Sequence, residues 1–160
     1  MTFSPELETR FEKLMHSYPP GRESSALIPM LLYAQDETGA LTSEVVEEIA
    51  RRLGITPLQA GEVISYYSML RRQPAGRHHL QICTNVSCML RGGQELYEHA
   101  CRRLGIRNRE VTADGEFSLE EAECLGACSW APAMLVNYDY HHDMTPEKLD
   151  RLIDSLEKKH

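Results

Sequence analysis

Apolar residues in the first 70 positions recur at the spacing of an α-helix. The clearest set occupies one face of a helix near the start of the chain: Leu7, Phe11, Leu14, Met15 and Tyr18. Three further helices are predicted over residues 24–39, 42–54 and 56–70. Thr56 and Gln59 have the T-x-x-Q spacing of a capping box at the start of the last one. The first part of the chain is therefore expected to be helical throughout.

The pattern changes at residues 71–79, which contain Pro74 and Gly76 and almost no apolar side chain, so a linker is predicted there. Beyond it the expected order is β-α-β-β-β-α. The strand candidates are "HLQICT", the weaker "EFSLEEAEC", "AMLVN" and "YHHDM", and the helix candidates are "GGQELYEHACRRLG" and "TPEKLDRLIDSLEK". These elements indicate a small sheet with helices packed on it, an α/β (α+β) fold. Two domains are predicted, at residues 1–75 and 76–160.

Composition limits the classes of function. The formal net charge of −7 argues against a nucleic-acid partner, whose phosphates need clustered Lys and Arg. The first residues, "MTFSPELETRFEKL", lack the apolar segment of a signal peptide, and the run "ALIPMLLYA" is too short to cross a bilayer. We therefore expect a cytoplasmic protein without direct membrane insertion. That compartment keeps thiols reduced, so its cysteines are expected to be ligands, nucleophiles or core residues.

Four of the five cysteines form two pairs, a C-x4-C at Cys83 and Cys88 and a C-x3-C at Cys124 and Cys128. Each pair lies where a predicted strand runs into a loop. Cys101 instead falls on the apolar face of a predicted helix, where a cysteine is usually a small buried hydrophobe. The two pairs are thus the candidate site.

Spacing alone leaves more than one chemistry open for the pairs. Thiol–disulfide sites usually have C-x-x-C, which neither pair shows. Structural zinc fits the first pair better than the second. A 2Fe-2S cluster also needs four thiolates, and the loop amides of residues 84–87 and 125–127 would be donors to its sulfurs. No nucleotide-binding motif is present, and the histidines and the acidic runs "EVVEE" and "LEEAE" are interpreted as solvated surface.

Three longer segments carry a specific resemblance. These are "SALIPMLLYAQDETGALTSEVVEEIARRLGITPLQAGEVISYYSML", "ICTNVSCMLRGG" and "VTADGEFSLEEAECLGACSWAPAMLVN". From about residue 20 onward, the chain resembles the family of the E subunit of bacterial NADH:quinone oxidoreductase, respiratory complex I. The resemblance implies an N-terminal helical domain followed by a thioredoxin-like domain with one 2Fe-2S cluster, the small ferredoxin of that complex. It maps the four cluster ligands onto Cys83, Cys88, Cys124 and Cys128, with no catalytic residue in the chain.

The resemblance also implies a role and a partner. The chain would be an electron-transfer component of an oxidoreductase, exchanging single electrons with the FMN of the flavin-bearing, NADH-binding F subunit. FMN and NADH would be bound in that partner. Through it the chain would join the peripheral arm of complex I, on the cytoplasmic side of the inner membrane. The alternatives are the homologous diaphorase component of an NAD-linked hydrogenase or formate dehydrogenase and, from another class, a non-redox module with structural zinc.

Pro132 follows the second cysteine pair and precedes the apolar segment "AMLVN". Thioredoxin-like folds commonly place a cis proline at this point, so the analogy makes a cis Ala131–Pro132 bond a candidate, and the sequence leaves the isomer open. A trans proline at the start of an edge strand is the alternative.

Overall fold

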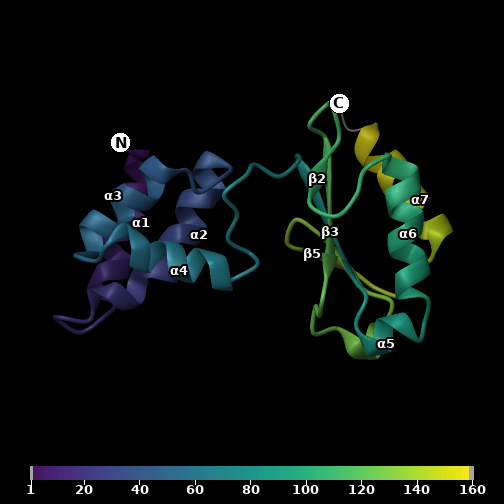
Figure 1. Ribbon diagram of the computed structural model, residues 1–160, viewed down its shortest axis with the longest axis horizontal. Coiled ribbons are helices and arrows are strands. Elements are labelled where there is room, and N and C mark those ends of the chain that lie inside the picture. Colours follow the sequence, from purple (N-terminus) through teal and green to yellow (C-terminus); the bar gives the residue numbers. More distant parts are fainter. Residues whose placement is uncertain (1, 159–160) are drawn as a thin grey trace. The chain divides into compact units, whose positions relative to one another are not determined.

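The computed structural model describes residues 2–158 and divides the chain into two compact units, Met1–Pro74 and Ala75–His160 (Figure 1). The division falls inside the segment predicted as a linker. Each unit has its own hydrophobic core, and each is described here by itself.

The first unit is helical. Its helices are α1 (Pro5–His16), α2 (Leu27–Thr38), α3 (Ser43–Leu53) and α4 (Pro57–Tyr66), and a 3-10 turn at Glu23–Ala26 precedes α2. The capping box at α4 is confirmed, because the Thr56 side chain accepts from the Gln59 amide and the Gln59 side chain accepts from the Thr56 amide. These reciprocal bonds satisfy donors that the helix start would otherwise leave unpaired.

Helix α4 ends at Tyr66 and does not continue to Leu70 as the pattern predicted. The reason is a tertiary contact with Gln35 of α2. Its side chain donates to the carbonyl of Met69 at 3.0 Å and accepts from the amide of Arg71 at 2.6 Å. The backbone of this segment is therefore bound to α2, and helical periodicity could not reveal it.

The second unit contains one mixed sheet. Its strands are β1 (His78–Cys83), β2 (Glu110–Val111), β3 (Phe117–Ala122), β4 (Met134–Val136) and β5 (Asp139–His141), in the order β2-β3-β1-β4-β5. The central pair β1–β3 is parallel, and the other neighbours are antiparallel. The helices are the short α5 (Val86–Met89), then α6 (Gly93–Leu104) and α7 (Pro146–Glu157). The predicted order is thus found, with β2 and α5 added to it.

Helices α6 and α7 cover the same face of the sheet (Figure 1). Alternate strand residues, including Leu80, Ile82 and Leu119, are fully buried and form the core with these helices. Because successive side chains of a strand point to opposite faces, the residues between them lie on the other face of the sheet.

The residues on that other face show that the interpretation of His79 and of the "LEEAE" run as solvated surface is wrong. His79, Ser118 and Glu120 are all buried. His79 Nδ1 lies 2.8 Å from Ser118 Oγ, and its Nε2 lies 3.1 Å from Glu120 Oε2. Burial acts to raise the pKa of Glu120, but hydrogen bonds from His79 and Gln81 outweigh it and lower that pKa below its ordinary value. The parallel register pairs His79 with Ser118 and thereby assembles this group.

Strands β4 and β5 form the predicted hairpin, with Asn137 in the left-handed region at φ 55°. The Ala131–Pro132 peptide bond just before β4 is cis, the isomer that the fold analogy made a candidate and the sequence left open. No helix within residues 2–158 is long and apolar enough to cross a membrane.

Candidate functional site

The two cysteine pairs meet at one edge of the sheet. Strands β1 and β3 run in parallel with Cys83 opposite Ala122, and the amide of Thr84 donates to the Ala122 carbonyl at 3.1 Å. The carboxyl ends of parallel strands leave a sheet at the same edge, so the loops that follow β1 and β3 begin side by side. The first loop carries Cys88 and the second carries Cys124 and Cys128.

The short helix α5 brings Cys88 back toward Cys83. Asn85 begins this helix, and its side chain accepts from the Val86 amide at 2.7 Å. Burial raises the pKa of the Cys88 thiol. The nearby thiols of Cys83 and Cys128 raise it further, against a backbone hydrogen bond from Ala133 that lowers it. Cys83 and Cys128 therefore both lie within electrostatic reach of Cys88.

Cys124 lies at the start of the second loop. Its Sγ accepts a hydrogen bond from the Gly126 amide at 3.4 Å, and the preceding carbonyl, that of Glu123, is 3.9 Å from the Cys83 Sγ. Gly126 has φ +71°, in the left-handed region that glycine adopts readily. The structure thus places all four cysteines at the same end of the sheet.

The site is enclosed on one side. Cys83 and Cys88 are buried, whereas Cys124 and Cys128 are exposed. Small apolar residues pack against the buried pair: Ala127, Ala131 and Ala133, with Leu125 partly buried beside them. One pair of thiols is therefore held in an apolar environment, and the other is presented to the surface.

Of the loop amides expected to face sulfur, that of Gly126 donates to the Cys124 Sγ, whereas two amides of the first loop have other partners. The Thr84 amide extends the β1–β3 pairing, and the Val86 amide bonds to the side chain of Asn85. Sequence reasoning missed Ala133, whose backbone contact with Cys88 joins residues 45 positions apart. Local sequence carries no signal for such a contact.

Cys101 lies on α6 and packs against the main core, as predicted, but it is partly rather than fully buried. Burial raises the pKa of Tyr97 on the same helix, and the Cys101 side chain, the second largest cause, raises it further. Cys101 thus has a neighbourhood of its own, different from that of the paired cysteines.

The donor set has the composition of a 2Fe-2S site. Each of the two irons of such a cluster takes two thiolates. Two thiol pairs with amide donors beside the sulfurs have this 2 + 2 composition.

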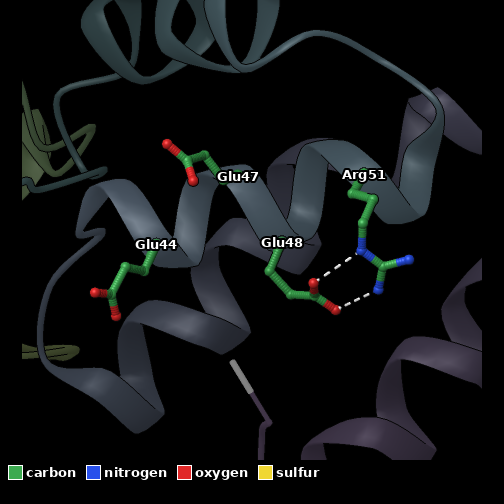
Figure 2. Close-up of a pocket in the computed structure, with 4 residues that line it drawn as sticks. All are labelled: Glu44, Glu47, Glu48 and Arg51. Carbon is green, nitrogen blue, oxygen red and sulfur yellow. Dashed lines mark hydrogen bonds and ion pairs between the residues drawn. The ribbon is translucent and has the colours of Figure 1, made fainter.

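A shallow hollow in the helical unit is unrelated to these cysteines. It lies along α3 and is lined by Glu44, Glu47, Glu48 and Arg51 (Figure 2). Glu48 forms an ion pair with Arg51 at 2.7 Å, and the carboxylates are typical of a solvated helix face. The hollow has no nucleophile and no soft ligand.

Nearly the whole chain is similar to proteins of one family. Residues 11–157 match the model of a family described as thioredoxin-like [2Fe-2S] ferredoxin. The chain is 43% identical over 156 residues to an E subunit of NADH-quinone oxidoreductase, the one numbered 2, of Rhizobium meliloti (strain 1021), and the match covers 98% of this chain and 89% of the relative. It is 41% identical over 146 residues to the E subunit of NADH-quinone oxidoreductase of Rickettsia bellii (strain RML369-C), covering 91% and 87%.

A solved structure has the same fold. It is the NAD+-reducing [NiFe]-hydrogenase in the H2-reduced state, with a TM-score of 0.74 at 21% sequence identity. The match covers 84% of this chain but 22% of the hydrogenase chain. At this identity the likeness concerns the fold alone.

Proposed function

The chain belongs to the family of thioredoxin-like [2Fe-2S] ferredoxins that includes the E subunit of NADH-quinone oxidoreductase, and from this premise we propose that it transfers single electrons within such an oxidoreductase. The family membership confirms the resemblance seen in the motifs and the predicted fold class. The observation that carries the proposal is the meeting of two cysteine pairs where the parallel strands β1 and β3 end.

We assign Cys83, Cys88, Cys124 and Cys128 as the ligands. When bound, a 2Fe-2S cluster supplies one-electron storage, with a charge of about −2 that becomes about −3 on reduction. Cys83 and Cys88 would hold its inner side against the alanines, and Cys124 and Cys128 its outer side. The Gly126 and Ala133 backbone groups stabilise negative charge on the sulfurs, which lowers the cost of an added electron in an apolar loop.

The partner is proposed to be the flavin-bearing, NADH-binding subunit of the same complex. The chain has no nucleotide-binding motif of its own. Hydride transfer from NADH moves two electrons, and the cysteine site can take one, so a flavin must lie between them. Exposure of Cys124 and Cys128 gives such a partner access to the site. Through this partner the chain is proposed to join the peripheral arm of the complex, on the cytoplasmic side of the inner membrane.

The alternative is a diaphorase component of an NAD-linked hydrogenase or formate dehydrogenase. The shared hydrogenase fold is compatible with it, but the sequence is about twice as similar to the quinone-reducing relatives, at 41–43% against 21% identity. We therefore place complex I first. Identification of the proteins that co-purify with the tagged chain decides between the two.

Two spectra test the proposal. The purified chain should be reddish-brown and should bleach on addition of a low-potential chemical donor, because a 2Fe-2S cluster absorbs visible light and zinc does not. NADH should bleach it in the presence of the flavin-bearing partner and should leave it unchanged without that partner. A colourless protein that contains zinc would contradict the cluster, and direct bleaching by NADH would contradict the need for the flavin-bearing partner.

A further inference from the structure

Tyr140 of β5 reaches the loop that carries the exposed cysteine pair. It lies opposite Leu135 in the β4–β5 hairpin, and its ring is half-exposed. The phenol hydroxyl donates to the carbonyl of Leu125 at 2.7 Å. Leu125 directly follows Cys124, so the tyrosine binds the backbone between Cys124 and Cys128.

The carbonyl of Leu125 and the amide of Gly126 belong to one peptide unit. In a trans peptide the C=O and N–H groups are coplanar and point in opposite directions. The Gly126 N–H of this unit donates to the Cys124 Sγ at 3.4 Å. A bond that fixes the direction of the carbonyl therefore also fixes the direction of the amide toward the sulfur.

Two further aromatic rings hold the tyrosine in place. The Tyr140 ring stacks on His142 with centroids 5.9 Å apart, and His142 stacks on Trp130 at 5.3 Å. The Trp130 amide donates to the Ala127 carbonyl at 3.0 Å, which ties this stack to the other end of the same loop. The Tyr140–His142–Trp130 stack thus contacts the loop both just after Cys124, at Leu125, and just before Cys128, at Ala127.

We propose that Tyr140 is a positioning residue that aims the Gly126 amide at the sulfur of Cys124. The inference rests on the proposed function, because it assumes that Cys124 is a cluster ligand. One-electron reduction adds one negative charge to the site and breaks no bond, with the electron coming from the partner or from a chemical donor. A hydrogen-bond donor to a ligand sulfur favours the more negative form. Tyr140 therefore raises the reduction potential through the peptide unit of Leu125 and Gly126.

The variant Tyr140→Phe tests this, since it keeps the ring and its stacking and removes the hydroxyl. We expect the equilibrium constant for one-electron reduction to fall about tenfold, which is the scale of one hydrogen bond. For a one-electron couple that is a shift of about 59 mV to more negative potential. Hydrogen exchange in peptides covering residues 124–128 should also become faster. The matched control is Tyr66→Phe, an exposed tyrosine of the helical unit, which should change neither quantity.

The outcomes separate this inference from the proposed function. If Tyr140→Phe binds the cluster, and its potential and loop exchange equal those of the wild type, the positioning role is wrong. A lower thermal midpoint with unchanged potential and exchange would also contradict it, because it would show a structural role alone. If the wild-type chain binds no cluster, the proposed function fails, and the exchange of residues 124–128 still decides whether Tyr140 orders the loop.

Discussion

At the scale of single residues, Gly93 shows how little space the site leaves. It is the first residue of α6, where a Cβ would lie 2.7 Å from the carbonyl oxygen of Cys83 and 2.8 Å from the carbonyl carbon of Cys88. Both neighbours are backbone atoms of proposed ligands, so neither can move without moving a thiol. The helix start is therefore in direct contact with the first cysteine pair.

We expect Gly93→Ala to destabilise the second unit by about 1–3 kcal/mol, the usual cost of overpacking, and to lower the iron bound per chain. Gly61→Ala is the control, because its Cβ would meet a flexible guanidinium of Arg72 at 3.3 Å and would lie within helix α4. The control should be neutral or stabilising, since alanine favours a helix. Normal iron content and stability in Gly93→Ala would show that the backbone can yield here.

In the helical unit, Arg52 makes contacts that join two helices. Its guanidinium binds both carboxylate oxygens of Glu8, donates to Glu48 at 2.7 Å, and lies over the rings of Phe3 and Phe11. Hydrogen bonds from Arg51 and Arg52 lower the pKa of Glu48 from 4.5 to about 2, and Arg52 also lowers the pKa of Glu8. This network joins α1 to α3.

Arg52→Leu is expected to destabilise the helical unit by about 1–2 kcal/mol, more than an exposed ion pair contributes.

Because the folded carboxylates bind protons less readily than unfolded ones, wild-type stability should be full above about pH 4.5 and decline as pH falls toward 2. Urea unfolding followed by hydrogen exchange in α1 and α3 measures both effects. Arg51 is exposed and pairs with the same glutamate, Glu48. Arg51→Leu should therefore lower the free energy of unfolding much less. Equal losses in the two variants would contradict the network.

Residues differed in how far sequence could predict them. The cap Thr56 was predictable because its partner, Gln59, lies three positions along the chain. His79 and Glu120 were not, since their contact depends on the β1–β3 register, which pairs residues about 40 positions apart. The bond between Tyr140 and Leu125 was not predictable either, since it joins a residue of β5 to a loop 15 positions earlier in the chain. The cysteines were recognised by motif, and their role as ligands stays a prediction.

At the scale of elements, local signals placed the start of helix α4 better than its end. Helix α4 begins at its capping box, but tertiary bonds from Gln35 end it four residues early. Strand β2 was missed because its two residues are both exposed and show no alternation. Helix α5 was missed because four residues are too few for a helical period.

The capping box gives a prediction at this scale. Thr56→Ala should destabilise the helical unit by about 1 kcal/mol, because it removes the acceptor of the Gln59 amide. Thr9→Ala is the control: Thr9 is exposed within α1 and donates to a carbonyl of its own helix. That control should change stability by less than about 0.5 kcal/mol. Chemical denaturation of the full chain compares the two, and equal effects would mean that the cap contributes nothing.

At the scale of the whole molecule, the cluster would link distant parts of the second unit. Between Cys88 and Cys124 lie 35 residues, and closing a loop of that length costs about 3 kcal/mol of chain entropy. A ligated cluster removes this freedom from the unfolded chain. The domain division at residues 1–75 and 76–160 remains a prediction, and iron removal tests it together with the link.

Removal of iron by a chelator should increase hydrogen exchange throughout residues 77–158 and leave helices α1 to α4 nearly unchanged. The reason is that the proposed ligands and their supporting contacts all lie in the second unit. Hydrogen exchange with mass spectrometry on both forms measures this. Equal loss of protection in the two units would argue against independent domains.

The central claim is that four particular thiols hold the cluster and the fifth does not. The most direct measurement is the content of iron and acid-labile sulfide in five single Cys→Ser variants, with the electron paramagnetic resonance signal after reduction. The wild type and Cys101→Ser should each contain about two irons and two sulfides per chain and give one unpaired electron. Cys83→Ser, Cys88→Ser, Cys124→Ser and Cys128→Ser should lose the cluster or bind it weakly with an altered signal. A full cluster in Cys128→Ser together with its loss in Cys101→Ser would contradict the claim.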